Sequence, residues 1–231
     1  MYRFIFLFSL HLFFTPLFTL AQNGAEKAKA IALFKATEPL FGKLVNFNVT
    51  NRDSALIINK ELIVKLEEVY TTDTSNSYVG FYLMNCYKIE GNLPGVIKWV
   101  KNQLLHSINE YDLPDLHSNI VWAYVSLGEF DSSKMYIDKI IELGKKIRRT
   151  GDSLTYYQIK DFITGIKQMA DTIYTKPTPK LVKLLQLKDI SPCKYAIEIL
   201  NYIQPFTKIY FDKILFAKTK DEITVKQEHC K

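Results

Sequence analysis

Apolar residues recur at helical spacing through most of the chain from Ala25 onward. One example is the set Leu62, Leu66, Val69 and Tyr70, whose members return every one to four positions. This period gathers apolar side chains on one face of an α-helix, whereas a half-buried strand alternates apolar and polar residues. The same spacing occurs in the sets Val79, Leu83, Cys86, Tyr87 and Val96, Trp99, Val100, Leu104. The pattern predicts an all-α fold built from consecutive amphipathic helices.

Proline and capping residues mark where several of these helices begin. Asn92 and Asp112 each stand two positions before a proline, in Asn92-Leu93-Pro94 and Asp112-Leu113-Pro114, and Ser191-Pro192 is a shorter version. Side chains of these types accept hydrogen bonds from the first backbone N–H groups of a helix, and proline suits its first turn. Asp131 and Asp152 are further candidate caps.

Glycines divide the pattern into repeated units. Gly91 and Gly128 each follow a tyrosine by four positions, Tyr87 and Tyr124, and both columns are offset by 37 residues. The same offset reaches Gly165, and two further columns keep their character: Val96, Ser133, Ala170 and Val100, Ile137, Tyr174. A period of about 20 to 50 residues is typical of a solenoid, because one pair of helices cannot bury its apolar stripe alone. We therefore expect tandem antiparallel helix hairpins that turn at the three glycines.

One unit of this repeat resembles a tetratricopeptide (TPR) repeat. Residues 118–143 carry the tyrosine, the Leu-Gly turn, the aromatic-Asp start of a second helix and a small residue beyond it: Tyr124, Leu127, Gly128, Phe130, Asp131 and Ser133. Residues 77–105 resemble that family through Tyr87 and Gly91, and residues 153–175 through Gly165 and Ala170. The resemblance implies a short solenoid over residues 22–176, in which the first helices of successive hairpins line a concave groove for a peptide or protein segment.

The ends of the repeat region are less regular. Residues 26–42 and 54–70 are expected to form a first, diverged hairpin, although Val45, Phe47 and Val49 alternate with asparagines as in a strand. This leaves two predictions open for the N-terminal flank.

The C-terminal region follows Pro177 and Pro179. Helices over 181–187 and 192–203 are expected to pack on or cap the array as a unit of residues 177–217, and Pro205 is predicted to end or kink the second helix. The pattern of 209–217 fits a helix or a strand. In the second case Ile223 and Val225 would complete a small β hairpin, and the charged tail 218–231 is expected to fray.

The N-terminus has the layout of a secretory signal peptide over residues 1–21. Arg3 supplies a positive charge, residues 4–20 are nearly all apolar, and Thr19-Leu20-Ala21 offers small residues for cleavage. The alternative is a retained anchor, but the apolar run is at the lower edge of the ~20 residues that a membrane span requires. We expect an exported protein, periplasmic or extracellular, with no transmembrane span after cleavage.

Export permits disulfides, and the chain has three cysteines. At most one pair can form. Cys193 with Cys230 is the expected pair, because Cys86 falls in an apolar helical pattern where a buried thiol is the ordinary state.

The formal charge is +6, spread along the chain except for one cluster: Lys145, Lys146, Arg148 and Arg149. This cluster follows an apolar helical run, and cations are favoured at a helix C-terminus, so we expect a solvated helix end. Contact with an anionic surface is the alternative. Nucleic acid is not an expected partner of an exported protein.

No motif predicts catalysis, a cofactor or a metal. His106 and His117 lie near a predicted connection between hairpins, without metal-ligand spacing, and are expected at the surface. The chain also lacks a G-x-S-x-G elbow and a glycine-rich phosphate loop. The sequence therefore favours a scaffold or adaptor rather than an enzyme. The alternative is an exported enzyme or small-ligand-binding protein whose site lies between the repeats and the C-terminal helices.

Projection of the TPR geometry onto the chain predicts the partner-binding residues. Two first helices contribute them, and they are Tyr78, Phe81, Asn85, Lys88, Asp115, Ser118, Trp122 and Ser126. Trp122 is the foremost candidate, since Trp and Tyr often dominate binding interfaces. Asn85 and Lys88 suggest a grip on a carboxylate, but Asp115 opposes it, so a hydrophobic or mixed groove for an extended or helical segment is expected. The alternative is that these aromatic residues only complete the stack of hairpins.

Overall fold

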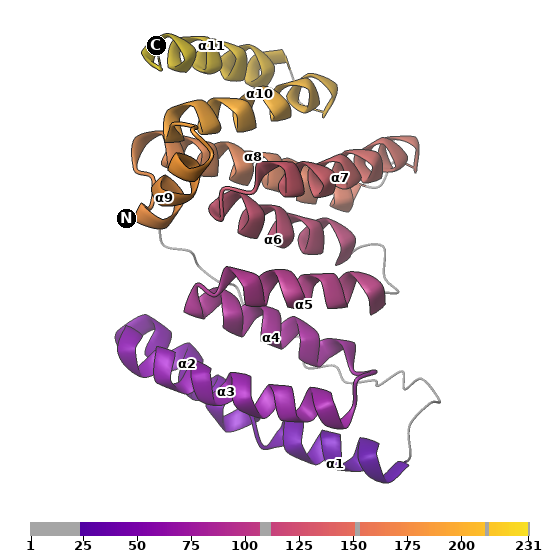
Figure 1. Cartoon of the computed structure of the whole chain (residues 1–231). Coiled ribbons are helices and arrows are strands. Elements are labelled where there is room, and N and C mark those ends of the chain that lie inside the picture. Colours follow the sequence, from indigo (N-terminus) through magenta and orange to yellow (C-terminus); the bar gives the residue numbers. More distant parts are fainter. Residues whose placement is uncertain (1–23, 107–111, 151–152, 211–212, 231) are drawn as a thin grey trace.

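The computed structural model describes residues 24–106, 112–150, 153–210 and 213–230, and within these ranges it contains helices and no strand. The predicted all-α class is therefore confirmed. The helices extend from α1 at one end of the molecule to α11 at the other, and α9 lies at the side of this stack (Figure 1). Their bounds are α1 Gly24–Lys35, α2 Glu38–Thr50, α3 Arg52–Thr72, α4 Ser77–Glu90, α5 Leu93–His106, α6 Leu113–Ser126, α7 Phe130–Thr150, α8 Ser153–Thr175, α9 Pro179–Leu187, α10 Pro192–Tyr210 and α11 Lys213–His229. The predicted signal peptide and the candidate cap Asp152 lie outside the described residues.

Two equivalent turns organise the middle of the stack. Gly91 joins α4 to α5 and Gly128 joins α6 to α7, with φ values of 68° and 75°. In both turns the glycine N–H donates to the carbonyl three residues earlier, and the next N–H donates to the carbonyl of Tyr87 or Tyr124, at 2.9 to 3.0 Å. This is the Schellman arrangement, which satisfies the last carbonyls of a helix and favours glycine at positive φ. The two turns, 37 residues apart, thus share their backbone conformation and their hydrogen bonds.

Equivalent positions in the two hairpins are buried in the same way. Val96 and Ser133 are fully buried in the second helices, as are Val100 and Ile137 one turn later. Side chains also join each hairpin to its neighbour. For example, the Tyr70 ring of α3 meets the Trp99 ring of α5 edge-on, at 4.7 Å between centroids. The apolar stripe that one hairpin leaves uncovered is thus closed by the next hairpin along the chain.

The predicted third hairpin turn is wrong. Gly165 lies inside α8, which runs unbroken from Ser153 to Thr175 and packs against α10 rather than against a second helix of its own. No proline interrupts the sequence around this glycine. Its neighbours instead continue one buried helical stripe: Ile159, Phe162, Ile163, Ile166, Ala170 and Ile173. Continuous burial on both sides of a glycine keeps it helical despite its low helix propensity.

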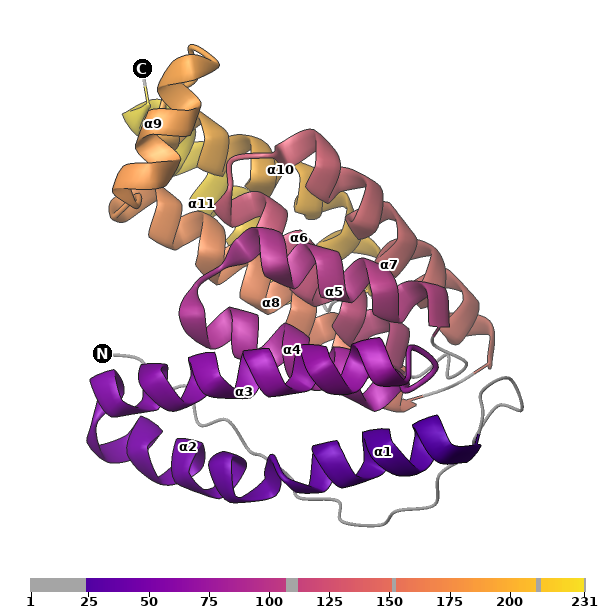
Figure 2. The same cartoon turned by 60° about the horizontal axis from the view of Figure 1, so that its bottom comes forward.

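The N-terminal unit has three helices instead of two. The chain breaks between α1 and α2 at Thr37, whose buried hydroxyl donates to the Phe34 carbonyl at 2.6 Å. Figure 2 shows α1 and α2 following one another alongside α3. The strand-like alternation at Val45, Phe47 and Val49 is wrong as a prediction, because these residues lie in α2. There Leu40 and Leu44, four residues apart, supply the buried side of a helix.

The C-terminal predictions of a strand pair and a frayed tail are also wrong. α10 continues through Pro205, and α11 covers most of the predicted tail. α11 is ordered because it is attached to two helices. Lys167 of α8 pairs with Glu222 at 2.6 Å, and Ile223 is buried. The predicted Cys193–Cys230 disulfide is present, with 6.0 Å between the Cα atoms, and Cys86 is a buried free thiol as expected.

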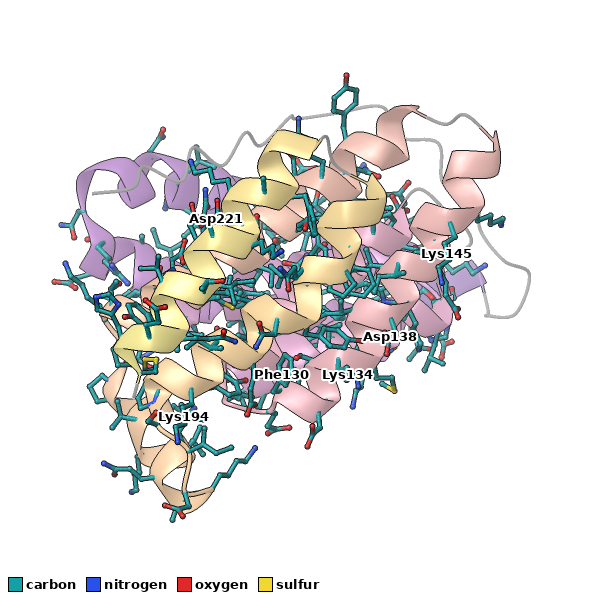
Figure 3. All side chains as sticks on the ribbon, turned by 90° about the horizontal axis from the view of Figure 1, so that it is seen from above. Phe130, Lys134, Asp138, Lys145, Lys194 and Asp221 are labelled. Carbon is teal, nitrogen blue, oxygen red and sulfur yellow. A yellow bond between two sulfur atoms is a disulfide. The ribbon has the colours of Figure 1, made fainter. Side chains whose placement is uncertain are left out.

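The C-terminal unit is fastened to the repeat region through α7. Phe130, Lys134 and Asp138 follow one another along this helix at four-residue intervals (Figure 3). Tyr202 of α10 meets all three side chains. Its ring lies 5.7 Å from the Phe130 ring and 5.1 Å from the Lys134 ammonium, and its hydroxyl donates to the Asp138 carboxylate. This contact supports the prediction that the region after Pro177 packs on the array.

A third turn of the same type connects α9 to α10. Asp189, at φ 54°, takes the place of the glycine, and Ile190 N–H donates to the Leu185 carbonyl at 3.0 Å. Its spacing does not follow the 37-residue offset, so the repeat does not predict it.

Two glycine substitutions separate a turn from a helix interior. Gly91→Ala should lower the free energy of unfolding by roughly 1 to 2 kcal/mol, since a side chain is strained at positive φ. Gly165→Ala should raise it by about 1 kcal/mol, because alanine has the higher helix propensity and a Cβ there meets nothing within 4 Å. Urea unfolding of both variants measures the difference. A loss of stability in Gly165→Ala would contradict the continuous α8.

Reduction of the disulfide should release α11 before any other helix. Cys193 and Cys230 are 37 residues apart, and a loop of that size contributes roughly 3 to 4 kcal/mol through chain entropy. Hydrogen exchange with and without a reductant should show lost protection in α11 alone, and Cys230→Ser should reproduce it in the absence of reductant. Equal loss in α5 and α6 would mean that the disulfide supports the whole fold.

Candidate binding surface

The predicted partner-binding residues lie on the first helices of two adjacent hairpins. Tyr78, Phe81, Asn85 and Lys88 belong to α4, and Asp115, Ser118, Trp122 and Ser126 belong to α6. Side chains link the two helices directly: Lys88 Nζ donates to the Asn119 side-chain oxygen at 2.6 Å and lies 5.9 Å from the centre of the Trp122 ring. We call Tyr78, Phe81, Lys88, Asp115, Asn119 and Trp122 the α4–α6 surface.

Two aromatic side chains of α4, Tyr78 and Phe81, expose apolar surface to solvent. Tyr78 is 70% exposed and Phe81 is 47% exposed. The Phe81 ring lies 6.1 Å from the ring of Tyr82, which in turn contacts Phe34 and Phe41 at 5.5 and 4.9 Å. Phe81 is therefore the outer member of an aromatic cluster built by α1, α2 and α4. These ring contacts hold the helix that carries Phe81 in place before any partner binds.

The Lys88 side chain forms part of the contact between the two hairpins. Burial lowers the pKa of its ammonium, and the carboxylate of Asp115 partly opposes that change. The hydrogen bond to Asn119 and the Trp122 ring replace much of its hydration. Asn119 was absent from the predicted set. Its position four residues after Asp115, on the same face of α6, is the sequence signal that could have included it.

The Asp115 carboxyl interacts with several charged groups. The residue is exposed, yet the surrounding protein raises the pKa of its carboxyl by desolvation. The carboxylates of Asp112 and of Asp161 in α8 raise that pKa further, while Lys88 lowers it. Carboxylates from two helices thus act on one another at this side of the surface.

The remaining predicted residues contribute less. Ser118 donates to the Pro114 carbonyl at 2.6 Å, and Asn85 donates to the Phe81 carbonyl at 3.0 Å, so both bond within their own helices. Ser126 is partly buried. Trp122 is half-buried and packs against the core, so it also helps to complete the stack, as the alternative interpretation predicted. A partner would meet mainly Tyr78, Phe81, the outer part of Trp122 and the Asp115 carboxylate.

The prediction that both histidines lie at the surface is wrong for His117. His106 is exposed at the end of α5, but His117 is only 6% exposed and its ring lies 5.9 Å from that of Tyr136. Burial and, to a smaller extent, the Lys139 ammonium lower the pKa of His117 to about 4. Its position together with Val121 and Tyr124 repeats the helical spacing of the buried face, which is the signal that could have placed it inside.

His117 borders a cavity, which bears on the alternative of an enzyme or small-ligand-binding protein. Its volume is about 320 Å³, and it is lined by Leu113, His117, Lys139, Glu142, Leu143 and Lys146. The cavity lies between α6 and α7, not between the repeats and the C-terminal helices as that alternative required. Its lining contains no serine, threonine or cysteine nucleophile, and the Nδ1 atom of His117 is enclosed by protein. We assign no reaction to it.

Two other predicted features concern surfaces and metals. Lys145 and Lys146 are exposed near the C-terminal end of α7, as a solvated helix end requires, and the side chains of Arg148 and Arg149 lie outside the described residues. Across the described part of the chain, histidine, cysteine and carboxylate side chains form no group of three or more suited to a metal ion. Within that same part, every helix is too short or too polar to cross a membrane.

Comparison of the chain with protein-family models, curated proteins and solved structures finds no match.

The buried His117 should make stability depend on pH. Its pKa lies near 4 in the folded chain and near the ordinary 6.5 in the unfolded chain, so the unfolded state binds the proton more strongly. Stability should therefore be complete above pH 6.5 and decline as the pH falls from 6.5 to 4. In thermal unfolding over this range, His117→Leu should show a flatter decline than the unmodified chain. His106→Leu, at an exposed position, should leave the decline unchanged.

Proposed function

We propose that this chain is an exported interaction module that binds a peptide or protein segment across the α4–α6 surface. The carrying observation is that Tyr78 and Phe81 are exposed on α4, the first helix that the bond from Lys88 to Asn119 joins to α6, where Trp122 is half-buried. In this proposal the chain serves as a scaffold or adaptor, with a TPR-like pair of hairpins as its binding unit.

In this proposal the binding free energy comes from burial of apolar surface that is carried by already packed helices. Full burial of one large apolar side chain contributes roughly 1.5 to 3 kcal/mol. Tyr78 and Phe81 retain much of that area for a partner, and the helices that carry them are already packed. Aromatic residues with few rotatable bonds lose little entropy on binding, which is why they often dominate interfaces.

Register between the hairpins supports the same proposal. The turns at Gly91 and Gly128 share their hydrogen bonds and their positive φ, so α4 and α6 end in the same way. Repeated first helices that end alike present their outer faces side by side. A segment that crosses both helices can then contact them at once, as the TPR resemblance implies.

The disulfide supports the exported location. Structural disulfides persist in oxidising compartments and are rare in reducing ones. The Cys193–Cys230 disulfide links the end of α11 to the start of α10. The fold therefore contains a covalent link that an oxidising compartment preserves.

Substitution of the exposed aromatic residues tests this function. The double variant Tyr78→Ala/Phe81→Ala should lose capture of a specific partner from envelope or culture-medium fractions, with a melting temperature within a few degrees of the unmodified chain. Ile57→Ala/Val64→Ala is the matched control, since those α3 side chains are 70% and 68% exposed. It should retain capture. Equal capture by both variants would place the binding surface elsewhere.

A photo-crosslinker gives a second readout that does not depend on affinity. Phe81→p-benzoylphenylalanine should form a covalent adduct with the same partner, whereas the crosslinker in place of Ile57 should not. Trp122→Ala is less informative, because Trp122 also packs against the core.

A further inference from the structure

The cavity between α6 and α7 combines properties that a small-ligand site requires. Its volume of about 320 Å³ falls at the lower end of the range of ligand pockets, which runs from about 300 to 1,000 Å³. Two helices in direct contact supply its lining: Leu113 and His117 from α6, and Lys139, Glu142, Leu143 and Lys146 from α7. None of these residues belongs to the α4–α6 surface, so this site is independent of the proposed function. We call it the α6–α7 cavity.

One wall of the α6–α7 cavity is formed before any ligand enters. His117 is only 6% exposed, and its ring lies 5.9 Å from the Tyr136 ring. Tyr136 in turn stacks on Tyr124 at 5.9 Å between centroids, and both tyrosines are buried. A ligand that packs against this wall does not have to order it, which lowers the entropic cost of binding.

The same aromatic wall holds an ammonium group. Lys139 Nζ lies 5.0 Å from the centre of the Tyr136 ring, and the lysine is exposed. His117 of α6 and Lys139 of α7 therefore contact one ring from two helices. The Lys139 ammonium is also the charged group that acts on the His117 ring. A ligand beside His117 thus meets a positive charge.

The lining carries more positive than negative charge. Among the described residues that line the α6–α7 cavity, Lys139 and Lys146 are cations and Glu142 is the only carboxylate. Glu142 stands three positions after Lys139 and four before Lys146, so it can neutralise one of them. Asp115 does not offset the remaining charge, because it is two positions before His117 and so lies on the other side of α6. The lining therefore has one cation in excess.

Apolar and neutral groups complete the lining. Leu113 and Leu143 are half-buried and border the α6–α7 cavity from α6 and from α7. The His117 ring is neutral at pH 7, because burial and the Lys139 ammonium lower its pKa to about 4. Its Nδ1 atom is enclosed and has no hydrogen-bond partner among the described residues, so a ligand can bond to this ring only at Nε2. A proton on Nε2 avoids an enclosed N–H without an acceptor, and there it can donate to an oxygen of the ligand.

We infer that the α6–α7 cavity binds a small organic anion of single charge, the simplest being a monocarboxylate with an aromatic or aliphatic body. The carboxylate lies beside Lys139. The body packs against Leu113, Leu143 and the His117 ring. A cationic ligand would meet the excess ammonium, and an uncharged one would cover that ammonium without pairing it, which is costly. An inorganic anion would leave both leucines uncovered.

Ligands of similar shape and different charge test this inference. The probes are 3-phenylpropanoate, 3-phenylpropanamide and 3-phenylpropylammonium, titrated into the full chain with its disulfide intact. The carboxylate should bind about fivefold more tightly than the amide, the effect expected of one exposed ion pair, and the ammonium compound should bind most weakly. Nuclear magnetic resonance locates the site. The carboxylate should shift the ring signals of His117, assigned with His117→Leu, and not those of the exposed His106.

Matched variants of α7 separate charge from apolar contact. Lys139→Gln should weaken binding of the carboxylate about fivefold and leave that of the amide unchanged. Lys145→Gln removes the same charge from an exposed position of the same helix outside the lining, labelled in Figure 3, and should change neither. Leu143→Ala should weaken both ligands to the same degree, because it removes apolar contact alone. Circular dichroism should show the same helicity for all three variants.

Each outcome supports or contradicts one part of the inference. Equal affinity for carboxylate and amide, or equal losses in Lys139→Gln and Lys145→Gln, would overturn the anionic ligand. Absence of a carboxylate-induced shift at His117 would overturn the site. The variant Tyr78→Ala/Phe81→Ala should bind the carboxylate as the unmodified chain does, so failure of partner capture and failure of this site are distinguishable.

Discussion

A helix hairpin of this size cannot cover its own apolar stripe, and the rest of the structure follows from that constraint. The buried columns of α5 and α7 are closed only when the neighbouring hairpin packs against them. The turns at Gly91 and Gly128 make this packing regular, because each ends a first helix in the same way and begins a second helix in the same direction. At the N-terminal end the stack is completed by α1 to α3, with a break between α1 and α2 at Thr37. At the C-terminal end it is completed by α8 to α11.

Local conformational requirements explain what the sequence could predict. Gly91 and Gly128 were predictable as turns because positive φ strongly favours glycine, and each glycine stood after a tyrosine and before a second amphipathic run. Gly165 has the same residue type at the same offset, but continuous apolar spacing on both sides keeps it helical. The residue type alone therefore did not determine the turn. The Cys193–Cys230 pair was predictable by elimination, since the apolar surroundings of Cys86 removed the third cysteine.

Contacts between distant segments explain what the sequence could not predict. The order of α11 depends on residues of α8 that are more than 50 positions earlier, such as Lys167 with Glu222. In the α4–α6 surface, Lys88 of α4 contacts Asn119 and Trp122 of α6, and this burial decides which side chains remain available. Helical projection gives the face of a residue. It does not give the partner that this residue meets across the stack.

The contact between α7 and Tyr202 has a consequence for how such a chain can change length. Phe130, Lys134 and Asp138 form one face of α7, and α10 occupies this face through Tyr202. A duplicated 37-residue unit appended after α7 would displace that anchor and uncover the terminal layers. A unit inserted upstream, between α5 and α6, would meet hairpin faces on both sides. Growth of the array is thus compatible with its interior and blocked at its C-terminal boundary.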